Sequence, residues 1–245
     1  ELNQLEDIGI NKESGNMRFK VISKYKINHD IEQFEYLASL GTETEKFNNL
    51  AILYKNVAAE INWPSATGLI SLSNKYQSIL KGTYNRLINE IDAPRLKQDV
   101  VNHSLNIDKI TNDYFDHEFG LTYIDNFLSP QALKSIQDFL LGSTIWSNII
   151  FKGGYIGTNL KEGLATPLVF QIAEELRNKL PKIFKNYPIK QIWAYKYDSQ
   201  AKKKDSIISG IHPHADDGKI TFNLWLTPNS ANLNLSSGGL VFHSL

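Results

Sequence analysis

The chain contains no cysteine and only one methionine in 245 residues. The lack of cysteine excludes disulfides, thiolate metal sites and cysteine nucleophiles. There is also no net charge, because 26 lysines and arginines balance 26 aspartates and glutamates, so no overall field attracts nucleic acid or a membrane surface. No apolar run approaches the roughly 20 residues of a spanning helix, and no signal-like amino end is present. These absences predict a cytoplasmic protein without nucleic-acid or membrane partners.

The first ninety residues predict an irregular arm over 1–29 and a helical segment over 30–91. Apolar residues at helical spacing indicate helices over about 30–41, 42–62 and 70–89. Asp30 and Thr42 are the expected caps of the first two helices, and Gly41 is the expected end of the first. The aromatic stripes of these helices are typical of a core. The segment could brace the rest of the chain, dock a protein partner or self-associate, and bracing is the simplest interpretation.

The second half has a different pattern. Residues 92–118 are mixed and polar, which predicts a linker before a domain over 119–245. In that domain "LTYID" at 121–125 indicates a short strand, and Ser129 and Thr166 each precede a proline that can open a helix. Alternating segments predict further strands over about 191–198, 207–214, 220–227 and 239–243. The order of elements therefore predicts an α+β protein whose strands form a sandwich or barrel with flanking helices.

The stretch "GIHPHADDGKITFNLWLTP", residues 210–228, carries the groups that suggest chemistry. His214 closes one strand and Asp216 follows in the turn, so an imidazole and a carboxylate can point into the same space. Two histidines and one carboxylate form the ligand set of non-haem Fe(II) oxygenases. His212, two residues before His214, competes as a ligand. The alternative is an ordinary surface turn, where aspartate is common because it bonds the local backbone.

The strand that follows this turn has two unlike faces. Its apolar side chains, Phe222, Leu224 and Leu226, alternate with a second set: Thr221, Asn223, Trp225 and Thr227. An asparagine in a dry core needs hydrogen-bond partners. Asn223 therefore either lines a pocket for a small polar ligand or faces solvent, and the sequence leaves both open.

The segment "YKYDSQAKKKDSIISGIHPHADDGKITFNLWLTPNSANLNLSSGGLVFH" resembles the 2-oxoglutarate- and Fe(II)-dependent dioxygenases of the prolyl-hydroxylase-like group. Phrases such as "DIEQFEYL", "YIDNFLSPQAL" and "WLTPNSANL" extend the resemblance, from about residue 30, to a bacterial subgroup often joined to tetratricopeptide segments. The resemblance implies a double-stranded β-helix, or jelly roll, within 119–245. It implies that His214 and Asp216 bind Fe(II), and that Tyr197 and Asn223 line the site of the cosubstrate 2-oxoglutarate. The implied reaction is hydroxylation of a substrate that the sequence does not identify.

The family's second histidine ligand and its basic 2-oxoglutarate anchor are expected beyond Leu245. The chain is therefore expected to be the N-terminal part of such a domain, which binds iron weakly and does not turn over alone. His243 lies on the strand after a Gly-Gly turn, where the family has no ligand, and is interpreted as an ordinary strand residue. The alternative is a non-catalytic helical interaction module joined to a degenerate barrel.

Overall fold

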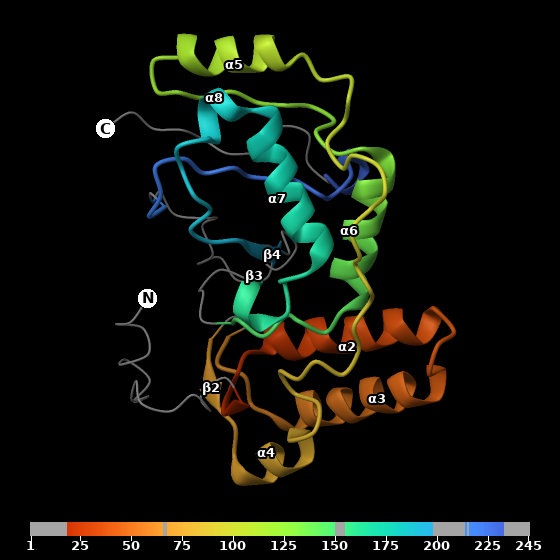
Figure 1. The fold of residues 1–245 in the computed structure, drawn as a ribbon. Coiled ribbons are helices and arrows are strands. Elements are labelled where there is room, and N and C mark those ends of the chain that lie inside the picture. Colours follow the sequence, from red (N-terminus) through yellow and green to blue (C-terminus); the bar gives the residue numbers. More distant parts are fainter. Residues whose placement is uncertain (1–18, 66–67, 150–154, 198–213, 215, 233–245) are drawn as a thin grey trace.

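The computed structural model describes residues 19–65, 68–149, 155–197, 214 and 216–232 (Figure 1). In chain order its elements are β1 (Val21–Ile22), α2 (Lys24–Ser39), α3 (Thr44–Glu60), β2 (Ile70–Ser71), α4 (Asn74–Leu80), α5 (Ile107–Asp116), α6 (Pro130–Gly142), β3 (Tyr155–Asn159), the 3-10 turn η2 (Leu160–Glu162), α7 (Pro167–Lys179), α8 (Pro181–Phe184), β4 (Trp193–Tyr197) and the 3-10 turn η4 (Asn229–Ala231). The strands form two antiparallel pairs, β1 with β2 and β3 with β4. The architecture is α+β, as the sequence predicts.

Helices α2 and α3 lie side by side and α4 lies next to α3 (Figure 1). Their inward side chains form one of the two apolar cores, in which Ile27, Phe47, Tyr54 and Leu80 are almost completely buried. The rings of Phe34 and Tyr54 meet edge to face with centroids 4.9 Å apart, a favourable geometry for aromatic pairs. The aromatic stripes of the helical segment therefore belong to a core, as expected.

Helix α2 begins earlier than the sequence pattern predicts, inside the expected arm over 1–29. Ser23 is its cap and accepts a hydrogen bond from the Lys26 amide, so the prediction that Asp30 caps the helix is wrong. Asp30 instead lies buried in the middle of α2. The polar residues before it interrupt the apolar periodicity, which hides the first turns of the helix. Gly41 ends the helix with a φ of 82°, as expected.

The next two helices are shorter than predicted. Helix α3 begins at Thr44, after Glu43 with a φ of 49°, and not at the predicted cap Thr42. The helix expected over 70–89 is reduced to α4, because Ile70–Ser71 pair with β1 and the chain turns directly after Leu80. Leu87, within the range of the expected helix, is 52% exposed.

The second apolar core gathers around α6 and α7. Ser129 caps α6 and Thr166 caps α7, and in both helices proline occupies the first turn, so these two predictions are confirmed. Phe139, Ile156 and Leu168 are completely buried in this core.

The segment 92–118, predicted to be a linker, packs against the second core and contains α5. Side chains of α7 bind its backbone: the Val100 and Val101 amides donate to Glu175 Oε2 at 2.8 and 3.0 Å, and the Leu96 amide donates to Gln171 Oε1 at 2.8 Å. Polar side chains that bind a neighbouring backbone cannot be distinguished from solvated ones in a sequence. The division into units 1–29, 30–91, 92–118 and 119–245 remains a prediction.

Replacement of Glu175 by alanine is expected to lower the free energy of unfolding by about 2–3 kcal/mol, because two buried amides lose their acceptor. Urea denaturation measures this change. Glu174→Ala is the matched control, because Glu174 pairs with Arg95 on the surface, with both side chains more than half exposed. Equal effects of the two substitutions would contradict the assigned role of Glu175.

The strand predictions are confirmed only in part. The strand expected over 191–198 corresponds to β4, whereas residues 121–125 form no strand. A single antiparallel bridge joins Leu128, three residues later, to Val101. Residues 220–227 belong to no ladder among the described residues, and 207–213 and 239–243 lie outside them. Strand β3, which pairs with β4 along its length, was not predicted. The described part of the chain forms no jelly-roll barrel.

Candidate functional site

Strands β3 and β4 present a cluster of tyrosines on one face. Tyr155 is the register partner of Tyr197, and its ring centroid lies 5.4 Å from that of Tyr195 and 6.3 Å from that of Tyr197. Gly157 lies beneath Tyr195, where a Cβ would come within 2.8 Å of the ring. Tyr197, predicted to contact 2-oxoglutarate, is 40% exposed at the end of β4. The ring of Tyr197 is therefore partly exposed to solvent.

His214 and Asp216, the predicted metal ligands, converge. The distance between His214 Nε2 and Asp216 Oδ1 is 3.7 Å, and the side chains are 59% and 31% exposed. Two ligand atoms about 2.1 Å from one ion, at a right angle, are about 3 Å apart. The observed separation is slightly larger, so small rotations of the side chains would bring both atoms within reach of one ion. An imidazole and a carboxylate are donors that suit Fe(II).

The described residues supply no third ligand beside His214 and Asp216. Within the ranges that the structure describes, no three His, Cys, Asp or Glu side chains come together as a metal site. The competing ligand His212 and the residue His243 lie outside those ranges. The neighbouring carboxylate of Asp217 accepts a hydrogen bond from Lys190, which lowers the pKa of that carboxyl below its usual value. The carboxylate of Asp217 therefore pairs with Lys190.

The two faces of residues 220–227 are confirmed. Phe222, Leu224 and Leu226 pack against the second core, and Phe222 contacts the Phe127 ring at a centroid distance of 5.0 Å. Asn223 and Trp225 lie on the exposed face, where Trp225 is 61% exposed. The side chain of Gln137 anchors the segment by donating to the Leu226 carbonyl at 2.6 Å. The side chain of Asn223 is exposed and lies on the face away from the second core.

A cluster of buried and half-buried basic and acidic residues, which we call the α2–β4 cluster, was not predicted. It consists of Lys26, His29 and Asp30 from α2 and Lys196 from β4. Asp30 Oδ1 lies 2.5 Å from Lys26 Nζ and 3.0 Å from His29 Nδ1, and His29 Nε2 lies 3.3 Å from Lys196 Nζ. Lys196 Nζ also lies 4.5 Å from the centroid of the Trp146 ring, a cation–π distance. The polar residues of α2 are the only sign of this cluster in the sequence. Their contact with Lys196 becomes visible only in the folded structure.

Burial dominates the ionisation of the α2–β4 cluster. It lowers the pKa of His29 to about 4, although the hydrogen bond to Asp30 opposes this shift. It also lowers the pKa of Lys196 to about 7, against the attraction of Asp30. Burial alone would raise the pKa of Asp30, but the Lys26 charge and the His29 hydrogen bond outweigh it and hold that pKa below its usual value. His29 is therefore neutral at pH 7, with Nδ1–H donating to Asp30 and Nε2 accepting from Lys196.

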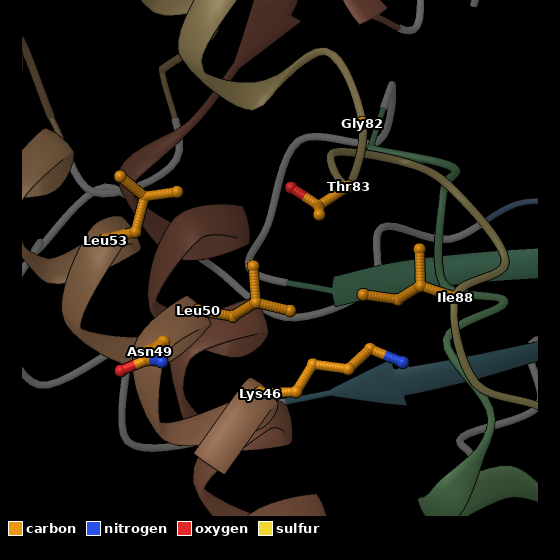
Figure 2. A pocket seen from close by; sticks show the side chains of 7 residues that line it. All are labelled: Lys46, Asn49, Leu50, Leu53, Gly82, Thr83 and Ile88. Atoms are coloured by element: carbon orange, nitrogen blue, oxygen red, sulfur yellow. The ribbon is translucent and has the colours of Figure 1, made fainter. Parts of the chain in front are cut away.

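An apolar hollow of about 600 Å³ lies between α3 and the chain that follows α4 (Figure 2). Leu50 and Ile88 project toward each other across it (Figure 2). The lining residues are Lys46, Asn49, Leu50, Leu53, Gly82, Thr83 and Ile88. Its volume would accommodate a few side chains of a partner.

Comparison of the chain with protein-family models, with curated proteins and with solved structures gave no match. Among the helices that the structure describes, none has both the length and the apolar composition needed to cross a lipid bilayer. The functional proposal therefore depends on the geometry of the residues and on the resemblance of their sequence pattern.

Proposed function

We propose that the chain is part of a non-haem Fe(II)- and 2-oxoglutarate-dependent dioxygenase, a hydroxylase with a jelly-roll domain over 119–245. The observation that carries the proposal is the 3.7 Å separation of His214 Nε2 and Asp216 Oδ1. Side chains two residues apart across a turn can point into the same space, and those of His214 and Asp216 do. The donor types are those that Fe(II) accepts, and the side chains of His214 and Asp216 are 59% and 31% exposed.

In this proposal His214 and Asp216 hold the metal, and Tyr197 and Asn223 line the site of 2-oxoglutarate. When bound, iron and 2-oxoglutarate would react with O2 and so supply the oxidising chemistry that hydroxylates an unactivated C–H bond. Asp216 contributes negative charge that favours a divalent cation. Tyr197, with its exposed ring, offers a hydroxyl and an aromatic surface to an organic acid, and the Asn223 amide offers both a donor and an acceptor.

Titration of the chain with Fe(II) under anaerobic conditions tests the proposal. We expect weak binding, and we expect His214→Ala and Asp216→Ala each to reduce the affinity by at least about tenfold, because each removes one of two charged or basic donors. Isothermal calorimetry or metal-dependent fluorescence measures the affinity. Asp217→Ala is the matched control, because its carboxylate is engaged by Lys190 and its removal leaves the proposed ligands in place.

His212→Ala and His243→Ala are expected to leave the affinity unchanged. A loss of binding in these two variants, with retention in His214→Ala, would assign the metal to a different ligand set. Wild-type chain that binds no Fe(II) would contradict the proposal.

A second candidate function is a non-catalytic interaction module, which the apolar hollow against α3 favours. Leu50, Leu53 and Ile88 give this hollow an apolar lining with Lys46 at its edge. A helical unit with such a surface can bind a partner without any metal. Absence of Fe(II) binding in the titration above would favour this candidate over the enzyme.

A further inference from the structure

The α2–β4 cluster lies where the two apolar cores meet. Its members come from α2, which belongs to the first core, and from β4, whose residue Ala194 packs against the second. Two further contacts join the same parts of the chain: Gln33 Nε2 donates to the carbonyls of Leu141 and Ser143, both at 3.0 Å, and the His29 ring meets the Trp146 ring at 6.4 Å. Polar contacts thus accompany the apolar packing between the cores, to which Tyr25 of α2 contributes. We propose that the α2–β4 cluster is a pH-sensitive joint, which releases the α2–α3 hairpin from β4 when its basic side chains bind protons.

The charge balance of the cluster explains this release. With His29 and Lys196 neutral, the Lys26 ammonium and the Asp30 carboxylate balance each other. When both basic groups bind a proton, three cations surround one buried carboxylate, an arrangement that a low-dielectric site disfavours. The other titratable or charged groups near the cluster are Glu32, Tyr54, Tyr84 and Arg86. Glu32, like Asp30, attracts the charge of Lys196 and opposes the lowering of its pKa. The two tyrosines remain neutral at acidic and neutral pH, because burial raises the pKa of each.

The direction of the effect follows from the pKa values. The pKa of Lys196 is about 7 in the fold against 10.5 for an ordinary lysine, so the separated state binds more protons between those values. The pKa of His29 is about 4 against 6.5, which gives the same imbalance between pH 6.5 and 4. In both windows the closed state is therefore favoured as the pH rises and is weakened as the pH falls. Asp30, with its lowered pKa, supports the closed state until the pH falls below that value.

Hydrogen exchange of the whole chain between pH 5 and 8, expressed as protection factors, tests this joint. From pH 8 to pH 5 we expect the protection of peptides from α2 and β4 to fall by on the order of a hundredfold, as the two pKa shifts together require. Peptides from α7, which does not contribute to the cluster, are expected to keep their protection. The wild-type profile alone can overturn the proposal: constant protection of α2 and β4 across this range would do so.

Variants identify the groups responsible. Lys196→Met retains an unbranched apolar stem without the charge, and His29→Asn retains an amide that can donate to Asp30. Lys196→Met is expected to reduce the pH dependence of the protection factors above pH 7, and His29→Asn is expected to reduce it between pH 6.5 and 4. The double variant is expected to reduce it in both pH ranges. Lys134→Met is the matched control, because Lys134 forms an exposed pair with Asp138, and it is expected to follow the wild type. A double variant with the wild-type pH dependence would refute the proposal.

Discussion

Replacement of Asp30 by alanine is expected to lower the free energy of unfolding by about 3–5 kcal/mol, as is usual when one partner of a buried ion pair is removed. Asp30 is 7% exposed and its partner Lys26 is 3% exposed. Without the carboxylate, the Lys26 ammonium has no counter-charge and His29 Nδ1–H has no acceptor. Urea denaturation followed by circular dichroism at pH 7 measures the loss.

Two comparisons separate this effect from a general sensitivity of α2. Glu35→Ala removes a carboxylate from the same helix, but Glu35 and its partner Lys55 are about half exposed, so we expect a much smaller change. The double variant Lys26→Met with Asp30→Leu replaces the pair by apolar side chains and is expected to recover most of the lost stability. A double variant as unstable as Asp30→Ala would show that packing, and not the unpaired charge, causes the loss.

Replacement of Phe139 by alanine is expected to lower the free energy of unfolding by about 3–5 kcal/mol through loss of apolar burial and formation of a cavity. Phe139 is completely buried on the inner face of α6, in the core that also contains Ile156 and Leu168. This is the core against which residues 220–227 pack through Phe222, so the variant should also weaken the support of the candidate metal site. The same denaturation experiment measures the loss.

Leu141→Ala is the matched control for Phe139→Ala. Leu141 lies on the same helix, two residues further on, but is 47% exposed. We expect a change below about 1 kcal/mol, the range of most surface substitutions. Comparable losses in the two variants would contradict the assignment of the inner face of α6.

Local signals predicted the helices with the clearest boundaries. Ser129–Pro130 and Thr166–Pro167 combine a capping hydroxyl with a proline in the first turn, and both helices begin where this chemistry places them. The start of α2 escaped prediction because its cap Ser23 is followed by a polar face that packs against β4. A periodicity analysis treats such a face as solvated. The β3 strand was missed because Gly157 interrupts its pattern, although the Tyr195 ring covers that glycine.

The candidate metal ligands show what spacing can and cannot predict. A histidine and an aspartate two residues apart across a turn can converge, and His214 and Asp216 do. The alternation of residues 220–227 likewise predicted that Phe222 and Leu224 share one face, and in the structure that face packs against the second core. The α2–β4 cluster could not be found in this way, since His29 and Lys196 are 167 residues apart. Pairing of such distant residues depends on the whole fold and leaves no local pattern.

This long separation has a consequence for the order of folding. The α2–α3 pair is joined by a short loop, so its contacts close early and at little cost in chain entropy. Gln33, however, binds the end of α6 about a hundred residues later, and Lys196 reaches His29 only when β4 is in place. We therefore expect the α2–α3 hairpin to form first, with Lys26 and Asp30 already paired, and its contacts with α6 and β4 to form later.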